Sequence, residues 1–282
     1  CDELGLFVIV NTPGWQFWND APEFAQRVYS DIRHLVRRDR NHPSVWLWEP
    51  ILNETWYPAD FAKNTRDIVD AEYPYPYCYC GSDSEARGHE NFPVHFAHPA
   101  NMQDASKEID PTKTYFTREW GDNVDDWNSH NSPSRVARNW GEQPMRVQAE
   151  HYALPSYPVT NYDILCKQPA QHVGGCLWHS FDHQRGYHPD PFYGGIMDVF
   201  RQPKFSYYMF MAQRPPVKSD RIAETGPMVF IAHEMTPFSG KDVVVYSNCD
   251  EVRLTFNKDG KTATYKKDKN RKGMPSPIIT FP

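Results

Sequence analysis

The sequence contains no run of apolar residues approaching the roughly 18 to 20 that a membrane-spanning helix requires. It also lacks the basic patch typical of proteins that bind nucleic acid. The formal net charge is −6, and the only lysine-rich segment, residues 261–272, is interrupted by threonine and aspartate. Residues 1–4 have neither the basic start nor the apolar region of a signal peptide. We therefore predict no membrane span, no nucleic-acid partner, and a solvent-exposed β-hairpin at residues 261–272.

The six cysteines form no C-x-x-C pair and show none of the spacings usual for zinc ligands. Cys78 and Cys80 fall on the same face of a predicted strand, which is typical of small residues in a core. We therefore predict no metal site and no cofactor.

Aromatic residues make up 15% of the chain, with 9 Trp, 16 Tyr and 16 Phe. Carbohydrate sites place aromatic rings against the apolar faces of sugars, and large cores use the same residues for packing. The composition is compatible with both uses. At 282 residues the chain is long enough for one large and one small domain.

Strand-like and helix-like segments alternate through residues 1–216, a pattern that favours a parallel sheet. The helix predicted over residues 22–38 has an apolar stripe at spacings of three and four residues, with Asp20 as its N-cap. The predicted strands are residues 5–10, 44–48, 75–79, 92–97, 114–120 and 174–181, and the other predicted helices are 61–69, 135–153 and 203–213. Beyond Pro216 the pattern changes to short strands separated by turns, at residues 228–231, 242–246, 251–257 and 261–266. This change predicts an antiparallel β domain over residues 217–282, of the sandwich type.

Two of the strand-like segments end in a carboxylate. Glu54, with Asn53 before it, closes the largely apolar run 44–52, and Glu119 lies near the end of the segment 114–120. In a (β/α) barrel the C-terminal ends of the strands meet at one mouth, where the chemistry of such enzymes takes place. Two carboxylates facing each other there are what hydrolysis of a glycosidic bond requires. Glu49 is a rival carboxylate, but it precedes Pro50 within the loop.

A set of spaced motifs resembles glycoside hydrolase family 2, the β-galactosidase family. The first motif is Arg38-Asp39-Arg40-Asn41-His42-Pro43-Ser44, leading into Trp48 and Asn53-Glu54. Four residues separate Trp48 from Asn53, where many members of the family have three. Further matches are Cys1-Asp2-Glu3-Leu4-Gly5-Leu6, Pro13-Gly14-Trp15, Gly174-Gly175-Cys176-Leu177-Trp178, Gly195-Ile196-Met197-Asp198-Val199-Phe200-Arg201-Gln202-Pro203-Lys204 and Val245-Tyr246-Ser247-Asn248-Cys249-Asp250-Glu251-Val252.

The resemblance covers essentially the whole chain and implies a fold. It implies an α/β chain with a (β/α)8 TIM barrel that lacks its first strands, over residues 1–216, followed by part of an Ig-like β-sandwich over 217–282. In the family, Cys1 would fall after the second barrel strand. We therefore expect the chain to be an internal portion of a longer enzyme.

The resemblance also implies the chemistry of the site. It implies a retaining, exo-acting glycoside hydrolase, with Glu54 as general acid/base and Glu119 as nucleophile. Asn53 would hydrogen-bond the sugar 2-hydroxyl, and Trp178 would form the floor of the sugar subsite. Further candidates for contact with the substrate lie near strand ends, each with a structural role as the alternative: His98, Asn101, Trp120, Asp182 and His183.

Several alternatives stay open. A β-galactosidase is the first expectation, and a β-mannosidase or a β-glucuronidase comes next, although the Asn-x-Lys signature for the uronate carboxylate is missing after Glu119. A barrel that binds carbohydrate without catalysis, or a structural β-rich assembly protein, belongs to a different class. The expected partner is an oligosaccharide or a β-glycoside derived from a polysaccharide. A homo-oligomer and a periplasmic or secreted location are also expected.

Overall fold

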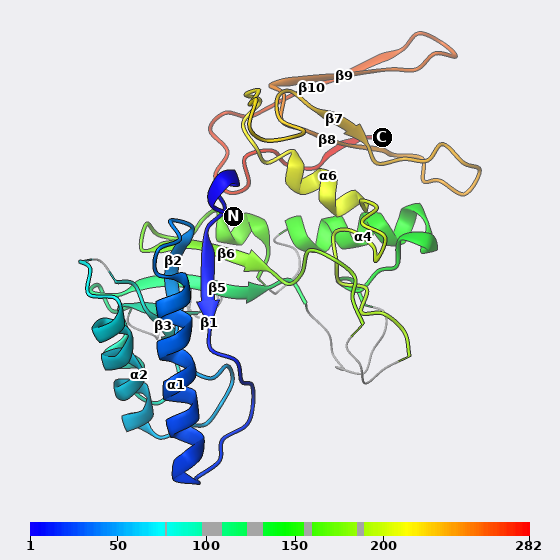
Figure 1. Ribbon diagram of the computed structural model, residues 1–282. Coiled ribbons are helices and arrows are strands. Elements are labelled where there is room, and N and C mark those ends of the chain that lie inside the picture. Colours follow the sequence, from blue (N-terminus) through cyan, green and yellow to red (C-terminus); the bar gives the residue numbers. More distant parts are fainter. Residues whose placement is uncertain (77, 98–108, 123–131, 155–159, 185–188) are drawn as a thin grey trace. The chain divides into compact units, whose positions relative to one another are not determined.

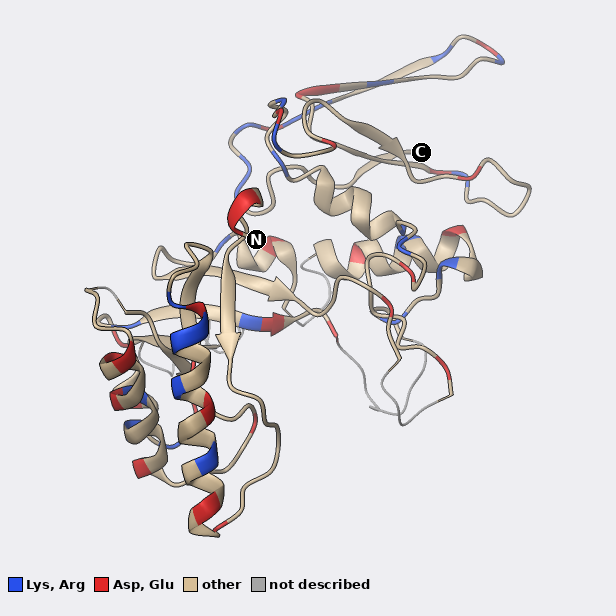
Figure 2. Cartoon of the chain, viewed as in Figure 1, with Lys and Arg blue, Asp and Glu red and all other residues tan. Residues whose placement is uncertain are grey.

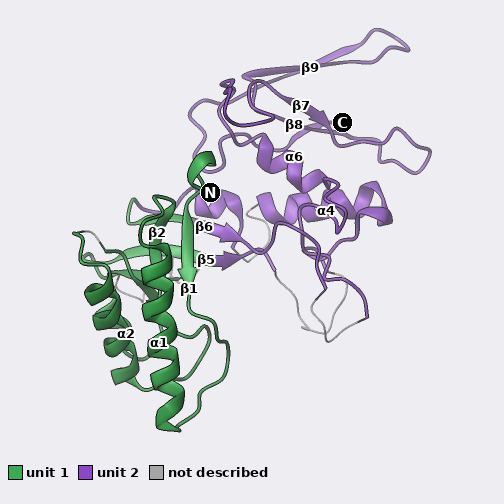
Figure 3. Cartoon of the chain, in the orientation of Figure 1, with its two compact units in different colours: residues 1–118, 170–174 green, residues 119–169, 175–282 purple. Residues whose placement is uncertain are grey.

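The computed structural model describes residues 1–76, 78–97, 109–122, 132–154, 160–184 and 189–282 (Figure 1). The chain divides into two compact units (Figure 3). Unit 1 comprises residues 1–118 and 170–174, and unit 2 comprises residues 119–169 and 175–282. These units differ from the domains predicted from the sequence, 1–216 and 217–282, which remain a prediction. No helix in the described part of the chain is long and apolar enough to cross a membrane.

Unit 1 is built on parallel strands. Strands β1 (Val8–Asn11) and β2 (Val45–Glu49) pair in parallel, and Trp48 of β2 forms a parallel bridge with Cys80. Strands β3 (Gly81–Asp83) and β4 (Val94–Phe96) pair in parallel, as do β4 and β5 (Thr114–Trp120). Strand β6 (His172–Leu177) completes a sheet of order β3-β4-β5-β6. The predicted α/β class with a parallel sheet is confirmed.

Two helices connect the first strands. In α1 (Pro22–Asp39) the predicted stripe is confirmed, since Val28, Ile32 and Val36 are buried. Proline is favoured at the start of a helix, where its missing N–H costs nothing. The predicted N-cap was wrong: Ala21 occupies that position, and the Asp20 carboxylate instead accepts a hydrogen bond from the Trp18 indole.

The second helix of unit 1 is α2 (Ala59–Glu72). Figure 2 shows acidic and basic residues interspersed along α1 and α2. Arg37 of α1 and Glu72 of α2 form an ion pair of 2.7 Å between the two helices. Short 3-10 helices lie at Asp2–Leu4 and His89–Asn91.

Strand β2 is covered on both faces, as expected of a parallel strand. Trp48 packs into the core cluster that contains the buried residues of α1 and α2. Leu47, its neighbour, packs instead with Phe96 of β4 and Phe116 of β5. Successive side chains of a strand point to opposite faces, so β2 separates a helix-facing layer from a second layer of strand residues. This arrangement is typical of a barrel wall.

The predicted strand at residues 75–79 was wrong in position, because the strand is β3 at Gly81–Asp83. Pro74 and Pro76 have no backbone N–H to donate to a neighbouring strand, which disfavours pairing there. The expected same-face placement of Cys78 and Cys80 is confirmed, since both lie in the helix-facing core with their Sγ atoms 4.0 Å apart.

The described residues of unit 2 form helices α4 (Glu142–Ala153), α5 (Tyr162–Leu165) and α6 (Phe205–Met211), and a 3-10 helix at Arg138–Trp140. The helix predicted over residues 135–153 is therefore shorter, and Pro144 lies in its first turn, where proline is tolerated. Trp120, Tyr152 and Met209 share a core cluster with Tyr246 of the C-terminal strands.

The C-terminal strands form two separate antiparallel sheets. Strands β7 (Val229–Ile231), β8 (Val243–Ser247) and β11 (Ile279–Phe281) make an antiparallel sheet of order β11-β8-β7. Strands β9 (Glu251–Thr255) and β10 (Thr262–Lys266) form an antiparallel hairpin. The hairpin shares a hydrophobic cluster with the sheet, in which Val252 meets Val245 and Phe281. The predicted antiparallel β region is confirmed. The hairpin predicted at residues 261–272 was wrong in position, because only β10 lies in that range and its partner is β9. Strand β11 was not predicted.

Candidate active site

Polar side chains near the ends of four strands of unit 1 meet in one network, which we call the mouth network: Asn11 of β1, Glu49 of β2, Asp83 of β3 and Arg118 of β5. The Glu49 carboxylate accepts a hydrogen bond from Asn11 Nδ2 and pairs with Arg118 Nη1, both at 2.5 Å. Arg118 Nη2 lies 3.1 Å from Asp83 Oδ1. Since C-terminal strand ends converge in a parallel barrel, this convergence marks the mouth.

The residues of the mouth network differ in their exposure to solvent. The Glu49 side chain is only 1% exposed, whereas Arg118 is 17% and Asp83 is 28% exposed. A buried carboxylate is costly unless it is paired and hydrogen-bonded, and each Glu49 oxygen has such a partner. The Arg118 guanidinium also lies over the Phe96 ring, 5.2 Å from its centroid. Glu49 is therefore a buried ion-pair partner that holds the Arg118 guanidinium in place.

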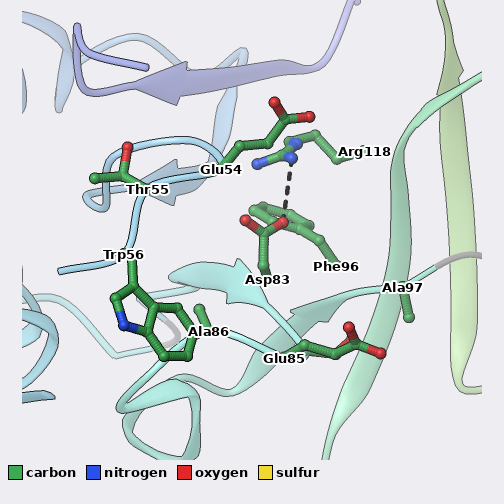
Figure 4. A pocket seen from close by; sticks show the side chains of 10 residues that line it. Glu54, Thr55, Trp56, Asp83, Glu85, Ala86, Phe96, Ala97 and Arg118 are labelled. Carbon is green, nitrogen blue, oxygen red and sulfur yellow. Dashed lines mark ion pairs between the residues drawn. The ribbon is translucent and has the colours of Figure 1, made fainter. Parts of the chain in front are cut away.

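A pocket of about 360 Å³ opens beside the mouth network. This volume is within the range of roughly 300 to 1,000 Å³ found for small-molecule sites. Figure 4 shows the Asp83 and Arg118 side chains facing each other there, with Trp56 and Glu85 on the opposite side. The pocket thus combines three carboxylates, one guanidinium and aromatic surface. Its lining residues are Glu54, Thr55, Trp56, Asp83, Ser84, Glu85, Ala86, Phe96, Ala97 and Arg118.

Glu54 lies in the loop after β2 and lines this pocket. Its backbone φ is 47°, in the left-handed region, and its side chain is exposed. The Glu54 Oε2 atom accepts two hydrogen bonds of 2.7 Å, from the Trp15 indole N–H and from the Gln16 side-chain amide. Glu54 is therefore a solvent-accessible carboxylate held at one oxygen.

The neighbouring Asn53 carries a buried side-chain oxygen, Oδ1, that finds no hydrogen-bond partner in the part of the chain that the structure describes. A buried polar atom without a partner calls for an explanation, and a ligand is one. The Asn53 backbone carbonyl accepts a hydrogen bond from the Gln16 amide, 3.1 Å away. The backbone position of Asn53 is thus fixed while its side chain keeps unused capacity to accept a hydrogen bond.

Glu119 and Trp120 follow Arg118 in β5 and belong to unit 2. Glu119 is partly buried. Trp120 is 4% exposed and packs against Tyr152, Tyr162 and Phe210, so core packing accounts for its position without a ligand. A role of Trp120 in substrate binding remains a prediction.

Trp178 and His183 come together in unit 2. The Trp178 ring, one residue beyond β6, lies 6.0 Å from the His183 ring and 5.4 Å from that of His179, to which it is joined by a cis peptide bond. Both Trp178 and His183 are partly exposed. The structure thus groups two of the predicted substrate-binding residues. Two others, His98 and Asn101, lie outside the described residues.

Asp182 is placed differently. Its carboxylate is buried, accepts a hydrogen bond from the Gly195 amide at 2.9 Å and pairs with Lys204 Nζ at 2.8 Å. Burial raises the pKa of Asp182 to about 6, although Lys204 opposes the shift, and burial lowers the pKa of Lys204. An internal ion pair accounts for the Asp182 side chain, and its contact with a substrate remains a prediction.

Sequence reasoning missed most of the residues around Glu54. Asp83 is the last residue of β3, a strand that was predicted a few residues too early, and correct placement of β3 would have marked Asp83 as a strand-end carboxylate. Trp15 matched a family motif, but nothing in its spacing pointed to Glu54. Within the described ranges no group of three or more His, Cys, Asp or Glu residues is arranged to hold a metal ion.

Comparisons with known proteins relate the chain to one family. The family model described as "Glycosyl hydrolases family 2, TIM barrel domain" matches residues 1–75. A β-galactosidase of Thermoanaerobacterium thermosulfurigenes is 28% identical over 290 residues, covering 99% of this chain and 38% of that protein. A β-galactosidase of Thermoanaerobacter pseudethanolicus is 26% identical over 268 residues, covering 91% of this chain and 33% of that protein.

A solved structure of a Parabacteroides merdae β-glucuronidase has a TM-score of 0.66 and 18% identity, over 99% of this chain and 39% of that one. At this identity the likeness concerns the fold alone. The chain spans about a third of the length of the curated β-galactosidases it matches. The chain is thus similar to the glycosyl hydrolases of family 2, and the TIM barrel domain model of that family matches residues 1–75.

Proposed function

We propose that the chain carries the catalytic centre of a retaining, exo-acting β-glycosidase, with Glu54 as general acid/base and Glu119 as nucleophile. One observation carries the proposal: a solvent-accessible carboxylate, Glu54, lines a pocket at the strand ends of a chain related to family 2 glycosyl hydrolases. Glu119 is on strand β5, directly after Arg118, and the Arg118 side chain lines that pocket.

The proposed reaction is a double displacement. The Glu119 carboxylate attacks the anomeric carbon while the bond to the glycosidic oxygen breaks and Glu54 transfers its proton to that oxygen. Glu54 then removes a proton from a water molecule, which attacks the anomeric carbon and releases Glu119. Retention of configuration by this route requires the two carboxyl groups to be about 5 to 5.5 Å apart.

Asn53 supports the proposal through its side chain. Its buried Oδ1 lacks a partner among the described residues, and a sugar hydroxyl can donate to that atom. A hydrogen bond to the 2-hydroxyl strengthens as the transition state forms. Trp178 and His183, which lie together, are proposed to contact the sugar as well.

The proposed substrate is a β-galactoside, since the two curated relatives are β-galactosidases. A β-glucuronide is the second candidate, because a guanidinium in the pocket could bind a uronate carboxylate. However, Arg118 already faces the carboxylates of Glu49 and Asp83, which offset its positive charge. This pairing favours a neutral sugar. A β-mannoside is the third candidate.

The C-terminal β region is the subject of a second proposal, which concerns its fold. The β region after residue 228 has two antiparallel sheets that share one hydrophobic cluster, as sheets of a sandwich do. We propose that it is part of an Ig-like domain following the barrel.

The test measures turnover of nitrophenyl β-galactoside, β-glucuronide and β-mannoside by the intact protein and by two variants. Glu119→Gln should lose nearly all turnover, and Glu54→Gln should lose about 10²- to 10⁴-fold, the usual share of general acid–base catalysis. NMR of the first product should show the β-anomer. A protein that binds sugar equally well with and without Glu119→Gln but turns over none of the three substrates would instead be a non-catalytic binding barrel.

A further inference from the structure

The Glu54 carboxylate is held asymmetrically. Both N–H donors that reach it, the Trp15 indole and the Gln16 amide, bind the same atom, Oε2, at 2.7 Å each. No described residue donates to the other oxygen, Oε1. A general acid carries its proton on one carboxylate oxygen. The unequal hydrogen bonding of Oε1 and Oε2 favours one of these two oxygens as the proton carrier.

The segment that carries the two donors is itself fixed to the loop of Glu54. Trp15 forms a parallel bridge with Asn53, and the Gln16 amide donates to the Asn53 carbonyl. Earlier in the segment, the Thr12 amide and hydroxyl both donate to the Glu49 carbonyl, at 3.0 and 3.2 Å. The loop after β1 therefore runs alongside the loop after β2, so that the donors and the acid share one backbone frame.

Gly14 allows this close approach. Its φ is +145°, and a Cβ atom there would lie 2.5 Å from a methyl carbon of the buried Leu52. A glycine is thus required where the first loop crosses the second, immediately before Trp15. This crossing and the backbone contacts with Asn53 fix the backbone position from which the Trp15 indole reaches Glu54.

An N–H donor can only face an acceptor, so an oxygen that accepts two N–H bonds is a poor place for the acidic proton. We propose that Trp15 and Gln16 are positioning residues that keep the proton of Glu54 on Oε1 and direct it at the glycosidic oxygen. This inference rests on the proposed function. In the step concerned, the proton moves from Oε1 to the glycosidic oxygen as the glycosidic bond breaks.

The test uses the dependence of the rate on the leaving group. Trp15→Phe keeps an aromatic ring and removes the N–H, and Gln16→Met keeps the side-chain length and removes the amide. The double variant of the intact protein is compared on phenyl and 2,4-dinitrophenyl β-galactoside, using kcat/KM, which reports the first chemical step. Dinitrophenolate leaves without a proton, whereas phenolate needs one.

The double variant should lose about 10- to 100-fold in kcat/KM on the phenyl substrate, because a misaligned acid transfers its proton poorly. On the dinitrophenyl substrate it should lose less than about threefold. Each single variant should show a smaller loss with the same selectivity, which keeps the test valid if the double variant folds poorly. Glu54→Gln supplies the reference for complete loss of the acid.

Trp18→Phe is the matched control. Trp18 is in the same loop and also donates its indole N–H to a carboxylate, but to Asp20 and not to Glu54. This variant should treat the two substrates like the wild type. Equal losses on both substrates in the Trp15 and Gln16 variants, or no loss at all, would overturn the positioning role. If instead Glu54→Gln itself hydrolyses phenyl galactoside normally, the proposed function fails, and the two failures are thereby distinguished.

Discussion

Both units contain cations paired with buried carboxylates, yet the pairs differ in their access to solvent. In unit 1 the mouth network has Glu49 at 1% exposure, but Arg118 and Asp83 reach 17% and 28% and line a pocket. In unit 2 the pairs Lys204–Asp182 and Arg135–Asp122 are between 0% and 3% exposed at every member. The first kind of pair is open to solvent at a pocket, whereas the second kind is enclosed by the protein.

The enclosed pairs of unit 2 hold chain segments together. Lys204 Nζ donates to the Val136 and Tyr193 carbonyls besides pairing with Asp182. Arg135 pairs with Asp122 and its guanidinium lies over the Phe192 ring, 3.7 Å from the centroid. Such satisfied internal charges have a structural role. Burial and ion pairing alone therefore do not mark a functional residue, and an open side toward a pocket is the additional criterion.

Removing Lys204 should have the largest effect. Lys204→Met leaves Asp182 buried without its cation and should lower the free energy of unfolding by about 3–5 kcal/mol. Urea denaturation measures this loss, and kcat/KM per folded molecule should stay within about threefold of the wild type. The variant Lys204→Met/Asp182→Asn, which removes both charges, should recover part of the stability. A Lys204→Met variant as stable as the wild type would contradict the structural role.

Replacing Arg118 should have the opposite effect to replacing Lys204, with a large loss of activity and a smaller loss of stability. Arg118→Met removes the cation that lies between Glu49 and Asp83 and precedes the proposed nucleophile, and kcat/KM on an aryl galactoside should fall about 10²-fold. The loss of unfolding free energy should be smaller than in Lys204→Met, because pocket water reaches the network. Arg118→Lys keeps the positive charge but loses the planar guanidinium that reaches both carboxylates. Its kcat/KM should therefore lie between those of the wild type and of Arg118→Met. An active but strongly destabilised Arg118→Met would place Arg118 among the structural pairs.

The pH dependence of stability should separate the pairs further. The folded-state pKa of Asp182 is raised to about 6 by burial, above its unfolded value of 3.8. Its contribution to stability is therefore fully present below about pH 4 and lost as the pH rises through 6. The unfolding free energy of the wild type minus that of Asp182→Asn should fall over this window, by at most about 1.4 kcal/mol per pH unit. A difference that rises with pH would contradict the raised pKa.

The smallest effect is expected from a pair open to solvent on all sides. Lys269 and Asp250 form an ion pair of 2.8 Å, with side chains 74% and 68% exposed. Exposed pairs gain little, because water and salt screen them. Lys269→Ala should leave both the melting temperature and kcat/KM unchanged within error. A clear drop in the melting temperature would show that the exposure of an ion pair does not predict its contribution to stability.

The sequence predicted those elements whose own residues decide their structure. Helix α1 was predicted to within a residue of its end, since its apolar stripe is strong, and β5 was predicted with both ends correct. The sequence pattern misplaced β3, because Gly81, Ser82 and Asp83 have low strand propensity and pairing with β4 decides their conformation. Strand β11 has three residues between prolines, too few for a periodic pattern.

The candidate site was predicted only in part for a similar reason. Glu54 and Asn53 stand in one recognisable motif, so the sequence alone marked them. The contacts of Glu54 with Trp15 and Gln16 join residues 39 and 38 positions apart. The mouth network likewise joins Arg118 to Glu49 over 69 positions. Such contacts depend on which strand ends become neighbours, and no local pattern records that.

The discontinuity of unit 1 bears on its synthesis. Strand β5 is completed by residue 120, but residues 170–174, which supply its outer neighbour, follow about 50 residues later. At roughly 5 to 20 residues per second, the ribosome needs about 3 to 10 s to add them. During that interval the free edge of β5 is a template for pairing with other chains. Nascent unit 1 should therefore be a client for chaperones until residue 174 has emerged.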